Sequence, residues 1–377
     1  MRVLTVGNMY PPHHLGGYEL VWRGAVEHLR KRGHDVSVLT TDHRRAGAVD
    51  PDPPHVHRTL RWWWRDHRFP RYGPIRRVRW ERHNWTVLAE RLEADRPEAV
   101  MWWSMGGMSL SLIERARDAG LPAVGVVHDD WLLYGPRVDG GPRLRQGPLD
   151  LGGVRWLFVS DFVRRKAVER SGLNLQRTEV VPSGIDEAHL RALGPGRAWD
   201  WRLLCVGRLD RRKGLDTAIE ALALLPEARL NVVGDGDDRL GRELRGQAAK
   251  LGVIDRVGFR GHREGAALDA QYEAADAVLF PVTWDEPWGL VPLEAMAHGV
   301  PVIATGRGGS GEYLRDGGNA LLHPAGDAEA LAAAVRRMAA DASLRERLRE
   351  AGAATAARHT ASRFHQRIEA VLEEETG

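Results

Sequence analysis

The sequence predicts an α/β protein built from two doubly wound domains. The first observation is its length of 377 residues, because a single hydrophobic core rarely organises more than about 300 residues. The second is a strand-then-helix pattern that runs along the chain twice, which is typical of parallel sheets with helices on both faces. The third is a turn-rich stretch between the two series, Gly194-Pro195-Gly196, which indicates a domain boundary.

The first series of elements starts at the N-terminus. Residues 3–7 form a short apolar run, residues 18–32 repeat apolar positions at helical spacing, and residues 35–40 alternate like a strand. Further apolar runs of strand length lie at residues 99–103, 123–127 and 156–159, with a helical pattern at 109–119. This series predicts a first domain over residues 1–190.

The second series begins after the turn-rich stretch. Its apolar runs of strand length lie at residues 203–206, 229–233, 277–280 and 300–304. Helix-forming composition predicts final helices near residues 328–340, 343–358 and 362–374. We therefore expect a second domain over residues 191–357 and a C-terminal helical segment over residues 358–377.

Composition indicates a folded protein without a membrane span. Hydrophobic residues make up 43% of the chain and charged residues 28%, as in ordinary globular domains. The apolar run at the start is too short for a signal peptide, and no later run approaches the roughly 18 residues of a membrane helix. We therefore expect a cytoplasmic protein. The single cysteine, Cys205, lies in an apolar run and is expected to be a buried structural thiol.

Residues 58–91 concentrate the basic charge of the chain. They contain ten arginines against three acidic residues, together with five tryptophans. Interleaved Arg and Trp suit an anionic membrane surface, a phosphorylated acceptor or nucleic acid. The alternative is an amphipathic surface helix whose tryptophans pack inward. We retain peripheral membrane contact and acceptor contact as open alternatives and expect no nucleic acid.

In open parallel sheets, ligands bind beyond the carboxyl ends of the strands, so the loops that follow the strands are the candidate sites. The first such loop, residues 8–17, ends in Gly16 and Gly17 directly before a predicted helix. Bare backbone N–H groups at a helix N-terminus can hold an anion. The alternative is a loop whose glycines only turn the chain.

The second loop contains His128, Asp129 and Asp130 directly after an apolar strand. His128 suits a hydrogen bond to a substrate hydroxyl, and the alternative role is to order the loop. The two carboxylates lack a cysteine or a second histidine at ligand spacing, so we expect no metal here.

The third loop carries Arg208 and Lys213 between glycines, after the strand at 203–206. A departing diphosphate gains negative charge as its bond breaks. A positioned Arg and Lys can stabilise this charge without Mg²⁺, and we expect the two cations to converge on one point. The alternative is ordinary surface charge.

The fourth loop follows the strand at 277–280 and places Glu286 and Glu294 on either side of a glycine-containing turn. The backbone N–H groups of Leu290 and Val291, at a helix start, can hold phosphate. Glu294 can accept hydrogen bonds from both hydroxyls of a ribose, and Glu286 can reach a sugar beyond the phosphates.

Together these motifs resemble the retaining glycosyltransferases of family 4, also described as group 1, along nearly the whole chain. The resemblance rests on the residues quoted above, on the stretches 181–186 and 233–236, and above all on the spacing of Glu286 and Glu294. It implies the GT-B fold, in which two Rossmann-like domains face a central cleft. It further implies that the first domain binds the acceptor, that the second binds the nucleotide, and that the last helix crosses back to the first domain.

The resemblance also assigns roles to individual residues. Arg208 and Lys213 match the pair that grips the diphosphate, Glu294 the ribose ligand, Glu286 the acid at the sugar, and His128 the histidine near the anomeric centre. The remaining candidates for nucleotide-sugar binding are Gly16, Gly17, Arg260, Trp288, Gly289, Leu290 and Val291. Trp288 stands where phenylalanine is usual, and Ser183 where asparagine is usual.

The activity implied is front-face transfer of a hexose, with retention, from a UDP- or GDP-linked sugar to an acceptor hydroxyl. The acceptor would be a small molecule, a glycan or a lipid-linked sugar, and neither a metal nor another cofactor is expected. The alternatives are a sugar-nucleotide epimerase or a phosphorylase on the same fold. A non-catalytic protein that binds a nucleotide sugar or nucleic acid is a further alternative.

Overall fold

The structure is a computed structural model that describes residues 1–45, 52–65, 68–70, 72–138 and 149–377. These residues form two compact units, one of Met1–Pro182 with Arg363–Gly377 and the other of Ser183–Ser362. The sequence pattern predicted divisions after residues 190 and 357. In the structure, Ile185 pairs with the backbone around Thr360, so the two connecting segments are joined to each other within the second unit.

The first unit contains a seven-stranded parallel sheet in the order β3-β2-β1-β4-β5-β6-β7. Its strands are β1 Arg2–Gly7, β2 Asp35–Thr41, β3 Val56–Leu60, β4 Ala99–Trp102, β5 Ala123–Val127, β6 Arg155–Phe158 and β7 Arg177–Val180. Its helices are α1 Gly17–Lys31, α2 Pro74–Asp95, α3 Ser111–Asp118, α4 Trp131–Val138, α5 Asp161–Arg170 and, from the chain's end, α12 Ala361–Thr376.

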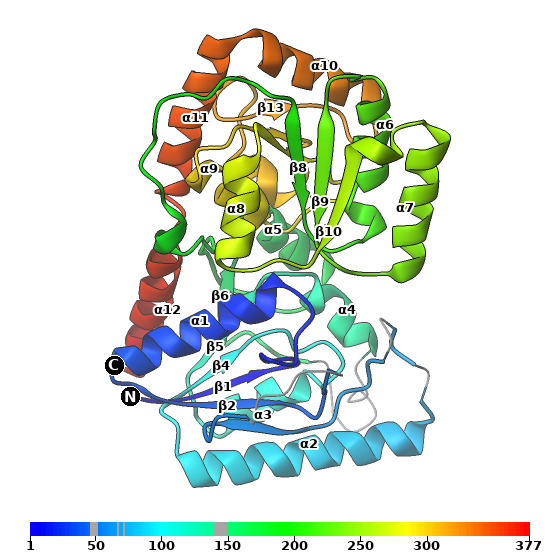
Figure 1. The fold of residues 1–377 in the computed structure, drawn as a ribbon. Coiled ribbons are helices and arrows are strands. Elements are labelled where there is room, and N and C mark those ends of the chain that lie inside the picture. The colour runs from blue at the N-terminus through cyan, green and yellow to red at the C-terminus, as the bar shows by residue number, and fades with distance from the viewer. Residues whose placement is uncertain (46–51, 66–67, 71, 139–148) are drawn as a thin grey trace. The chain divides into compact units, whose positions relative to one another are not determined.

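The last helix, α12, is part of the core of the first unit and runs beside α1 (Figure 1). Its apolar face places Phe364 and Ile368 against strand and α1 side chains. On its polar side, the carboxylate of Glu369 binds His28 and His34, each at 3.0 Å. Residues from both ends of the chain therefore complete one hydrophobic core.

The second unit contains a six-stranded parallel sheet in the order β10-β9-β8-β11-β12-β13. Its strands are β8 Arg202–Val206, β9 Arg229–Val233, β10 Val257–Gly261, β11 Ala277–Phe280, β12 Val302–Ala304 and β13 Leu321–Leu322. Its helices are α6 Leu215–Ala223, α7 Asp238–Lys250, α8 Ala266–Ala274, α9 Leu290–Ala297, α10 Ala328–Ala340 and α11 Ala342–Ala356. Short 3₁₀ turns include η2 Glu187–His189 and η3 Arg211–Lys213.

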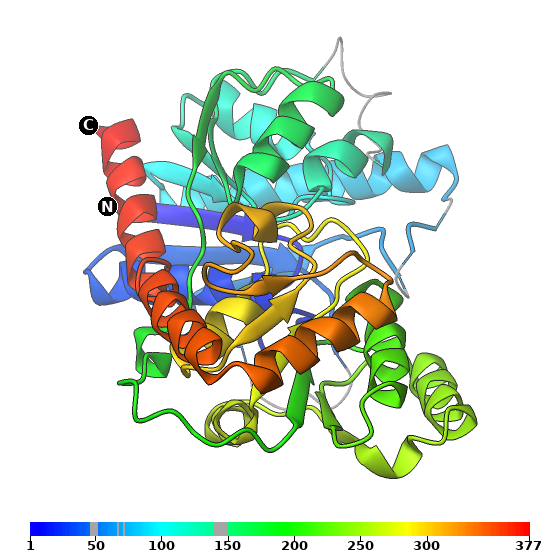
Figure 2. The same cartoon turned by 90° about the horizontal axis from the view of Figure 1, so that it is seen from above.

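Aspartate side chains start several of these helices. Asp237 accepts hydrogen bonds from the first turn of α7, and Asp327 does so for α10. Asp341 ends α10 and caps α11. The two helices, in orange and red-orange, accordingly meet end to end (Figure 2). Each cap satisfies backbone N–H groups that a helix leaves without internal partners, which fixes where the helix begins.

Two parallel sheets with flanking helices confirm the predicted fold class. The predicted strands near 3–7, 123–127 and 277–280 lie at their expected places, as do the helices near 328–340 and 343–358. Cys205 is buried, as predicted, and burial raises the pKa of its thiol to about 12. None of the helices in the described ranges combines the length and apolar character that a bilayer crossing requires.

The Arg- and Trp-rich stretch 58–91 is not a single helix, because it begins in β3 and ends in α2. Trp62 and Trp63 are buried, and the indole N–H of Trp85 donates to Ser111 at 2.8 Å. These tryptophans pack inward, whereas Ile75 at the start of α2 is 85% exposed. Positions 66, 67 and 71 lie outside the described residues.

Candidate functional site

The candidate residues of the second unit lie where its strand order reverses. From β8 the chain first adds β9 and β10 on one side, and then β11 to β13 on the other. The loops after β8 and β11 therefore leave the sheet side by side, at the point where open α/β sheets bind ligands. These are the loops that carry Lys213 and Glu286.

Gly214 allows the two loops to approach closely. Its φ is +66°, and a Cβ placed on it would lie 1.9 Å from the carbonyl oxygen of Pro281. Only glycine fits both the left-handed backbone and this contact. The glycine that follows Lys213 thus brings the end of the β8 loop against the segment that leads to Glu286.

Lys213 and Glu286 form an ion pair across this junction. The Nζ atom of Lys213 lies 2.7 Å from Oε2 of Glu286, and the side chains are 25% and 12% exposed. The indole N–H of Trp284 donates to the same oxygen at 3.0 Å. The described residues offer no hydrogen bond to the second oxygen, Oε1, so it is available to a substrate hydroxyl.

Arg208 is held by a different carboxylate. One of its guanidinium nitrogens lies 3.0 Å from Oδ2 of Asp210, and Arg212 also binds Asp210, at 2.6 and 2.9 Å. Hydrogen bonds and charge from Arg212 and Arg208 hold the pKa of Asp210 well below its usual range. Arg208 and Lys213 thus lie on one loop and bind different acids, and their convergence on one diphosphate stays a prediction.

The start of α9 offers backbone N–H groups to an anion. Gly289 precedes the helix with a φ of +86°, and no side chain in the described part of the chain caps it. The N–H groups of Leu290 and Val291 in the first turn point out of the helix end, where the helix dipole favours negative charge. The hydroxyl of Tyr313 donates to the Gly289 carbonyl at 2.5 Å and fixes the turn.

Glu294 lies one turn further along α9 and is bound by Tyr272 of α8. The Tyr272 hydroxyl donates to Oε2 of Glu294 at 2.6 Å. Burial raises the pKa of Glu294, while the Tyr272 hydrogen bond and the nearby His189 and His298 act in the opposite direction. The carboxylate is thus oriented by a fixed donor, as a bidentate ribose ligand would need to be.

Trp288 and Arg260 occupy different surroundings. Trp288 is 5% exposed, and its indole N–H donates to the Ser183 carbonyl at 2.8 Å. Its ring therefore packs in the interior next to the turn at Gly289. Arg260 is exposed at the end of β10 and donates to the side chain of Asn231 at 2.9 Å.

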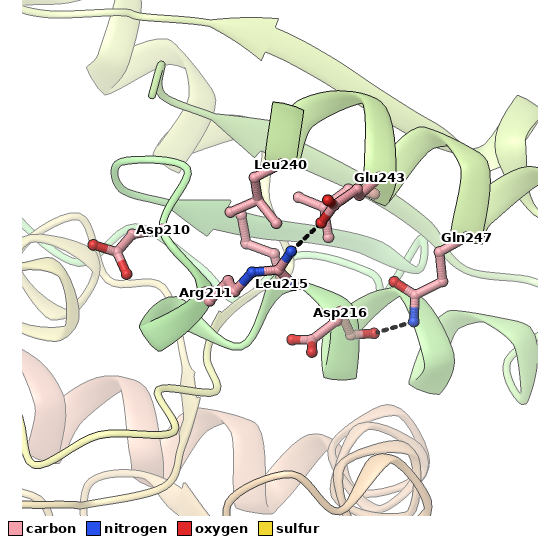
Figure 3. Close-up of a pocket in the computed structure, with 8 residues that line it drawn as sticks. Asp210, Arg211, Leu215, Asp216, Leu240, Glu243 and Gln247 are labelled. Carbon is pink, nitrogen blue, oxygen red and sulfur yellow. Dashed lines mark hydrogen bonds and ion pairs between the residues drawn. The ribbon is translucent and has the colours of Figure 1, made fainter. Parts of the chain in front are cut away.

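The cavities in the described part of the second unit differ in what they can hold. One of about 340 Å³ lies at the carboxyl ends of β8, β9 and β10, lined by residues that include Gly234, Gly236 and Gly261. This volume falls within the range of small-molecule pockets, about 300–1,000 Å³. The pocket drawn in Figure 3, between α6 and α7, holds only about 70 Å³ and is spanned by the Arg211–Glu243 ion pair. It is too small for a nucleotide.

In the first unit, Gly16 and Gly17 are exposed at the start of α1, as an anion site requires. One of the N–H groups there is already used, because Gly16 donates to the Glu19 carboxylate at 3.0 Å. This acid also places negative charge at the helix N-terminus. An anion at this loop would therefore have to compete with Glu19.

His128 lies directly after β5 and stacks on Tyr18, with ring centroids 4.8 Å apart. Since Tyr18 follows Gly17, the stack connects the predicted glycine loop to the predicted histidine. Burial lowers the pKa of His128 from 6.5 to about 3, so the ring is neutral at physiological pH. Its Nε2 atom is buried and makes no hydrogen bond to the described residues, an arrangement that suits a ligand partner.

The carboxylates beside His128 have separate partners. Asp130 pairs with Lys166 at 2.7 Å, whereas Asp129 accepts a hydrogen bond from the backbone of Trp131 at 2.9 Å. Burial raises the pKa of Asp129 to about 7. The two acids are thus part of the loop structure around His128.

Comparison with known families accounts for both units. Residues 15–189 match the family model described as Glycosyltransferase Family 4, and residues 198–355 match the model described as Glycosyl transferases group 1. The chain belongs to the family 4, group 1 glycosyltransferases. Its fold is GT-B, with two Rossmann-like domains.

The curated relatives of this glycosyltransferase are named for different products. It is 41% identical over 150 residues to the lipopolysaccharide core biosynthesis glycosyltransferase LpsE of Rhizobium meliloti. This match covers 40% of this chain and 43% of LpsE. The chain is 34% identical over 226 residues to the phosphatidyl-myo-inositol mannosyltransferase of Mycobacterium leprae, which covers 58% of each chain. The matches span about half the length of these relatives.

A solved structure resembles this glycosyltransferase over its full length. HepE of Anabaena, crystallised with UDP and glucose, has a TM-score of 0.73 and 21% sequence identity, with 99% of each chain covered. At this identity the resemblance shows the shared fold.

The structure also brings residues into the candidate site that the sequence did not indicate. Asp210 lies between Arg208 and Lys213, and Trp284 lies two residues before Glu286. Their polar side chains could therefore have been recognised as candidates from the sequence. Tyr18 directly follows the glycine pair. Tyr272 gave no signal, because it meets Glu294 only through the packing of α8 against α9.

Proposed function

We propose that this glycosyltransferase moves a hexose from a UDP- or GDP-linked sugar to an acceptor hydroxyl, with retention of configuration. The observation that carries the proposal is the Lys213–Glu286 pair at the switch point of the second sheet. The pair combines a cation with an acid on the segment that leads into α9, and no side chain of the described residues caps the first turn of that helix. This arrangement suits a pyrophosphate with a sugar attached.

In the proposed reaction, the bond from the anomeric carbon to the diphosphate oxygen breaks and a bond to the acceptor oxygen forms on the same face. The proton of the acceptor hydroxyl passes to a phosphate oxygen, so no protein base is needed. Lys213, Arg208 and the first-turn N–H groups of α9 stabilise the charge that develops on the diphosphate. Preorganised donors of this kind are each worth about 2.7–4 kcal/mol of barrier, so the diphosphate requires no metal ion.

The donor is held by groups on either side of the diphosphate. Glu294, oriented by Tyr272, accepts hydrogen bonds from the ribose hydroxyls, and Oε1 of Glu286 accepts one from the migrating sugar. The glycine-lined cavity at the ends of β8 to β10 has room for the base. The main chain beside Arg260 borders that edge of the sheet.

We assign His128 a hydrogen bond to the donor sugar, following the family resemblance. Its buried Nε2 atom, which lacks a partner among the described residues, supports this role. Because the pKa of the ring is lowered to about 3, His128 acts as a neutral hydrogen-bonding group at physiological pH and does not supply a positive charge.

We further propose an acceptor at a lipid or glycan surface, with the first unit as its binding domain. The named activities of LpsE and the mannosyltransferase support a lipid-linked acceptor. The exposed first turns of α2, with Ile75, Arg76 and Arg79, support peripheral contact with an anionic bilayer. Cosedimentation with anionic and neutral vesicles tests this contact.

The donor is tested first by thermal shift with UDP-, GDP-, dTDP- and ADP-linked sugars. A donor at 100 times its Kd should stabilise the protein by about 2.7 kcal/mol. Transfer is then tested by nucleotide release, which should depend on an acceptor, and by NMR of the product anomer. An inverted anomer would exclude retention, and a product still attached to the nucleotide would indicate an epimerase.

A further inference from the structure

Two histidines and one aspartate meet in the second unit, outside the residues assigned to the donor. His189 comes from η2, Asp269 from α8, and His298 directly follows α9. Nδ1 of His189 lies 3.1 Å and Nε2 of His298 lies 3.2 Å from the same atom, Oδ1 of Asp269. One ligand atom from each residue lies within 4.8 Å of the others.

The hydrogen bonds of His298 determine what its second nitrogen can do. Nδ1 lies 2.8 Å from the carbonyl oxygen of Glu294, and since a carbonyl only accepts, Nδ1 must carry the hydrogen. In the neutral ring, Nε2 is then a bare acceptor that faces a carboxylate oxygen, also an acceptor. Two facing acceptors repel each other unless a positive charge lies between them. That charge is either a proton on Nε2 or a metal ion.

We propose that the cation is a divalent transition-metal ion of the zinc type, bound by His189 Nδ1, His298 Nε2 and Asp269 Oδ1. Ligands at about 2.0–2.2 Å around a tetrahedral ion are separated by roughly 3.3–3.5 Å. The observed separations of 3.1 and 3.2 Å from Oδ1 need little change to reach this geometry. Two imidazoles and a carboxylate are zinc ligands, whereas calcium and magnesium favour oxygen alone.

The surroundings of the three ligands match those of metal sites. Imidazole ligands commonly donate their other N–H to a carbonyl, as His298 does, and the ligating carboxylate is itself hydrogen-bonded. Arg191 provides that bond, at 3.1 Å from Oδ2 of Asp269, and leaves Oδ1 to the ion. The His298 side chain is 1% exposed and that of His189 is 31% exposed, so solvent reaches the site from the His189 side.

A second group of potential ligands, His34, Glu369 and Glu373 in the first unit, is a weaker candidate. Both carboxylate oxygens of Glu369 are already in use, because Oε1 binds Arg32 and His34 while Oε2 binds His28. The guanidinium of Arg32 contacts the oxygen that an ion shared with His34 would need. This group therefore serves as a comparison for the first.

The proposed ion would have a structural role. It would fasten the segment that leads from η2 to the turn at Gly194 onto α8 and the end of α9. Because His298 bonds to the Glu294 carbonyl and stacks on Tyr272 at 4.9 Å, the ion would also stiffen the surroundings of Glu294. The site is separate from the diphosphate contacts, so the proposal stands independently of metal-free transfer.

The test is metal binding by the full chain after dialysis against a chelator. Zinc is titrated in competition with a chromophoric chelator, and cobalt is added separately to record its visible spectrum. We expect one ion per chain, a cobalt spectrum of a four-coordinate site with water as the fourth ligand, and a higher Tm with zinc. The variants H189N and D269N should bind zinc at least about tenfold more weakly, since loss of an outer-shell partner alone costs 10–100-fold.

Matched controls are H262N, which removes an exposed histidine of the same unit, and H34N, which disrupts the comparison group. Both should keep the wild-type affinity and cobalt spectrum. Because H189N changes a partly exposed side chain, it should fold even if a variant of His298 does not. Absence of stoichiometric zinc from the wild type, wild-type affinity in H189N and D269N, or loss of zinc in H34N would each overturn the proposal.

Discussion

The ammonium group of Lys213 lies 2.7 Å from the Glu286 carboxylate, and this contact joins the loops after β8 and β11. The acid holds the cation in place before a substrate arrives. In the proposed reaction, a bound diphosphate would give the cation a second negative partner, while Glu286 would keep the hydrogen bond from the indole N–H of Trp284. One ion pair thus positions both side chains to which we assign these roles, Lys213 at the leaving diphosphate and Glu286 at the sugar.

Lys213→Ala should lower kcat by about 100- to 1,000-fold, the loss expected when one preorganised donor is removed from a developing oxyanion. The fold should remain intact because the side chain is partly exposed. Nucleotide-release kinetics measure the effect. The matched control is Arg211→Ala, a neighbouring cation that pairs with Glu243 on another face, and it should keep near-normal turnover. Near-normal turnover of Lys213→Ala would refute the assigned role.

Glu286→Gln should also reduce kcat, because the neutral amide no longer holds Lys213 by charge. In a double-mutant cycle, the combined variant Lys213→Ala with Glu286→Gln should lose less than the sum of the single changes. We expect a coupling of about 0.5–3 kcal/mol, the range for residues in contact. Full additivity would mean that the two residues act independently.

Tyr272→Phe removes the donor that orients Glu294 and leaves the ring in place. Since hydrogen bonds to charged groups contribute about 1.5–3 kcal/mol, we expect donor affinity to fall by roughly 10- to 100-fold with a smaller change in kcat. Calorimetric titration with the donor measures the affinity. Tyr72→Phe, which keeps the ring contact to Arg76 in the first unit, is the control and should bind the donor normally.

His128 should make stability depend on pH in a defined direction. Its pKa falls from 6.5 to about 3 on folding, so between these values the unfolded chain binds a proton that the folded chain does not. Stability is therefore lost as the pH drops below about 6.5. His128→Asn removes this loss, and relative to wild type the variant should gain up to about 2 kcal/mol between pH 7.5 and 5, as measured by denaturant unfolding.

Asp129→Asn provides a comparison with the opposite sign. Burial raises the pKa of Asp129 from 3.8 to about 7, so the folded chain retains its proton between these values and stability is lost as the pH rises through them. Replacement by asparagine should therefore raise the free energy of unfolding, relative to wild type, more at pH 7.5 than at pH 5. Parallel pH profiles for the two variants would contradict both assignments.

Trp288→Phe installs the ring that is usual in the family and removes the indole N–H. The Ser183 carbonyl then loses its donor, and leaving a buried acceptor unsatisfied costs about 1–3 kcal/mol. We expect a lower Tm and nearly unchanged donor affinity, because the ring lines the back of the turn. A large loss of donor affinity at constant Tm would instead make Trp288 a direct ligand.

Sequence patterns predicted the sheets well where strands are buried, and poorly at the sheet edges. The run at 123–127 is apolar throughout and becomes the fully buried β5, whereas β7 carries Arg177 and Glu179 and was not predicted. Edge strands carry charge because one side faces solvent, which removes the apolar signal. The strand β3, at the other edge of the same sheet, was not predicted for the same reason.

The sequence predicted the positions of Arg208, Lys213 and Glu286 on loops that follow strands, because each lies in a local motif; their roles stay predictions. The candidate site could not be predicted where packing creates the contact. Tyr272 binds Glu294 from another helix, and His189, Asp269 and His298 come together from three separate segments. Contacts of this kind follow from sheet order, which local patterns do not encode.

The position of α12 has a consequence for synthesis on the ribosome. The core of the first unit includes Phe364, Ile368 and Leu372, which are translated after the whole of the second unit, Ser183–Ser362. The unit that is continuous in sequence can therefore complete its core first, although it is made second. Until α12 is made, α1 contributes its side chains to this core of the first sheet, but the contacts of Phe364, Ile368 and Leu372 are missing from it.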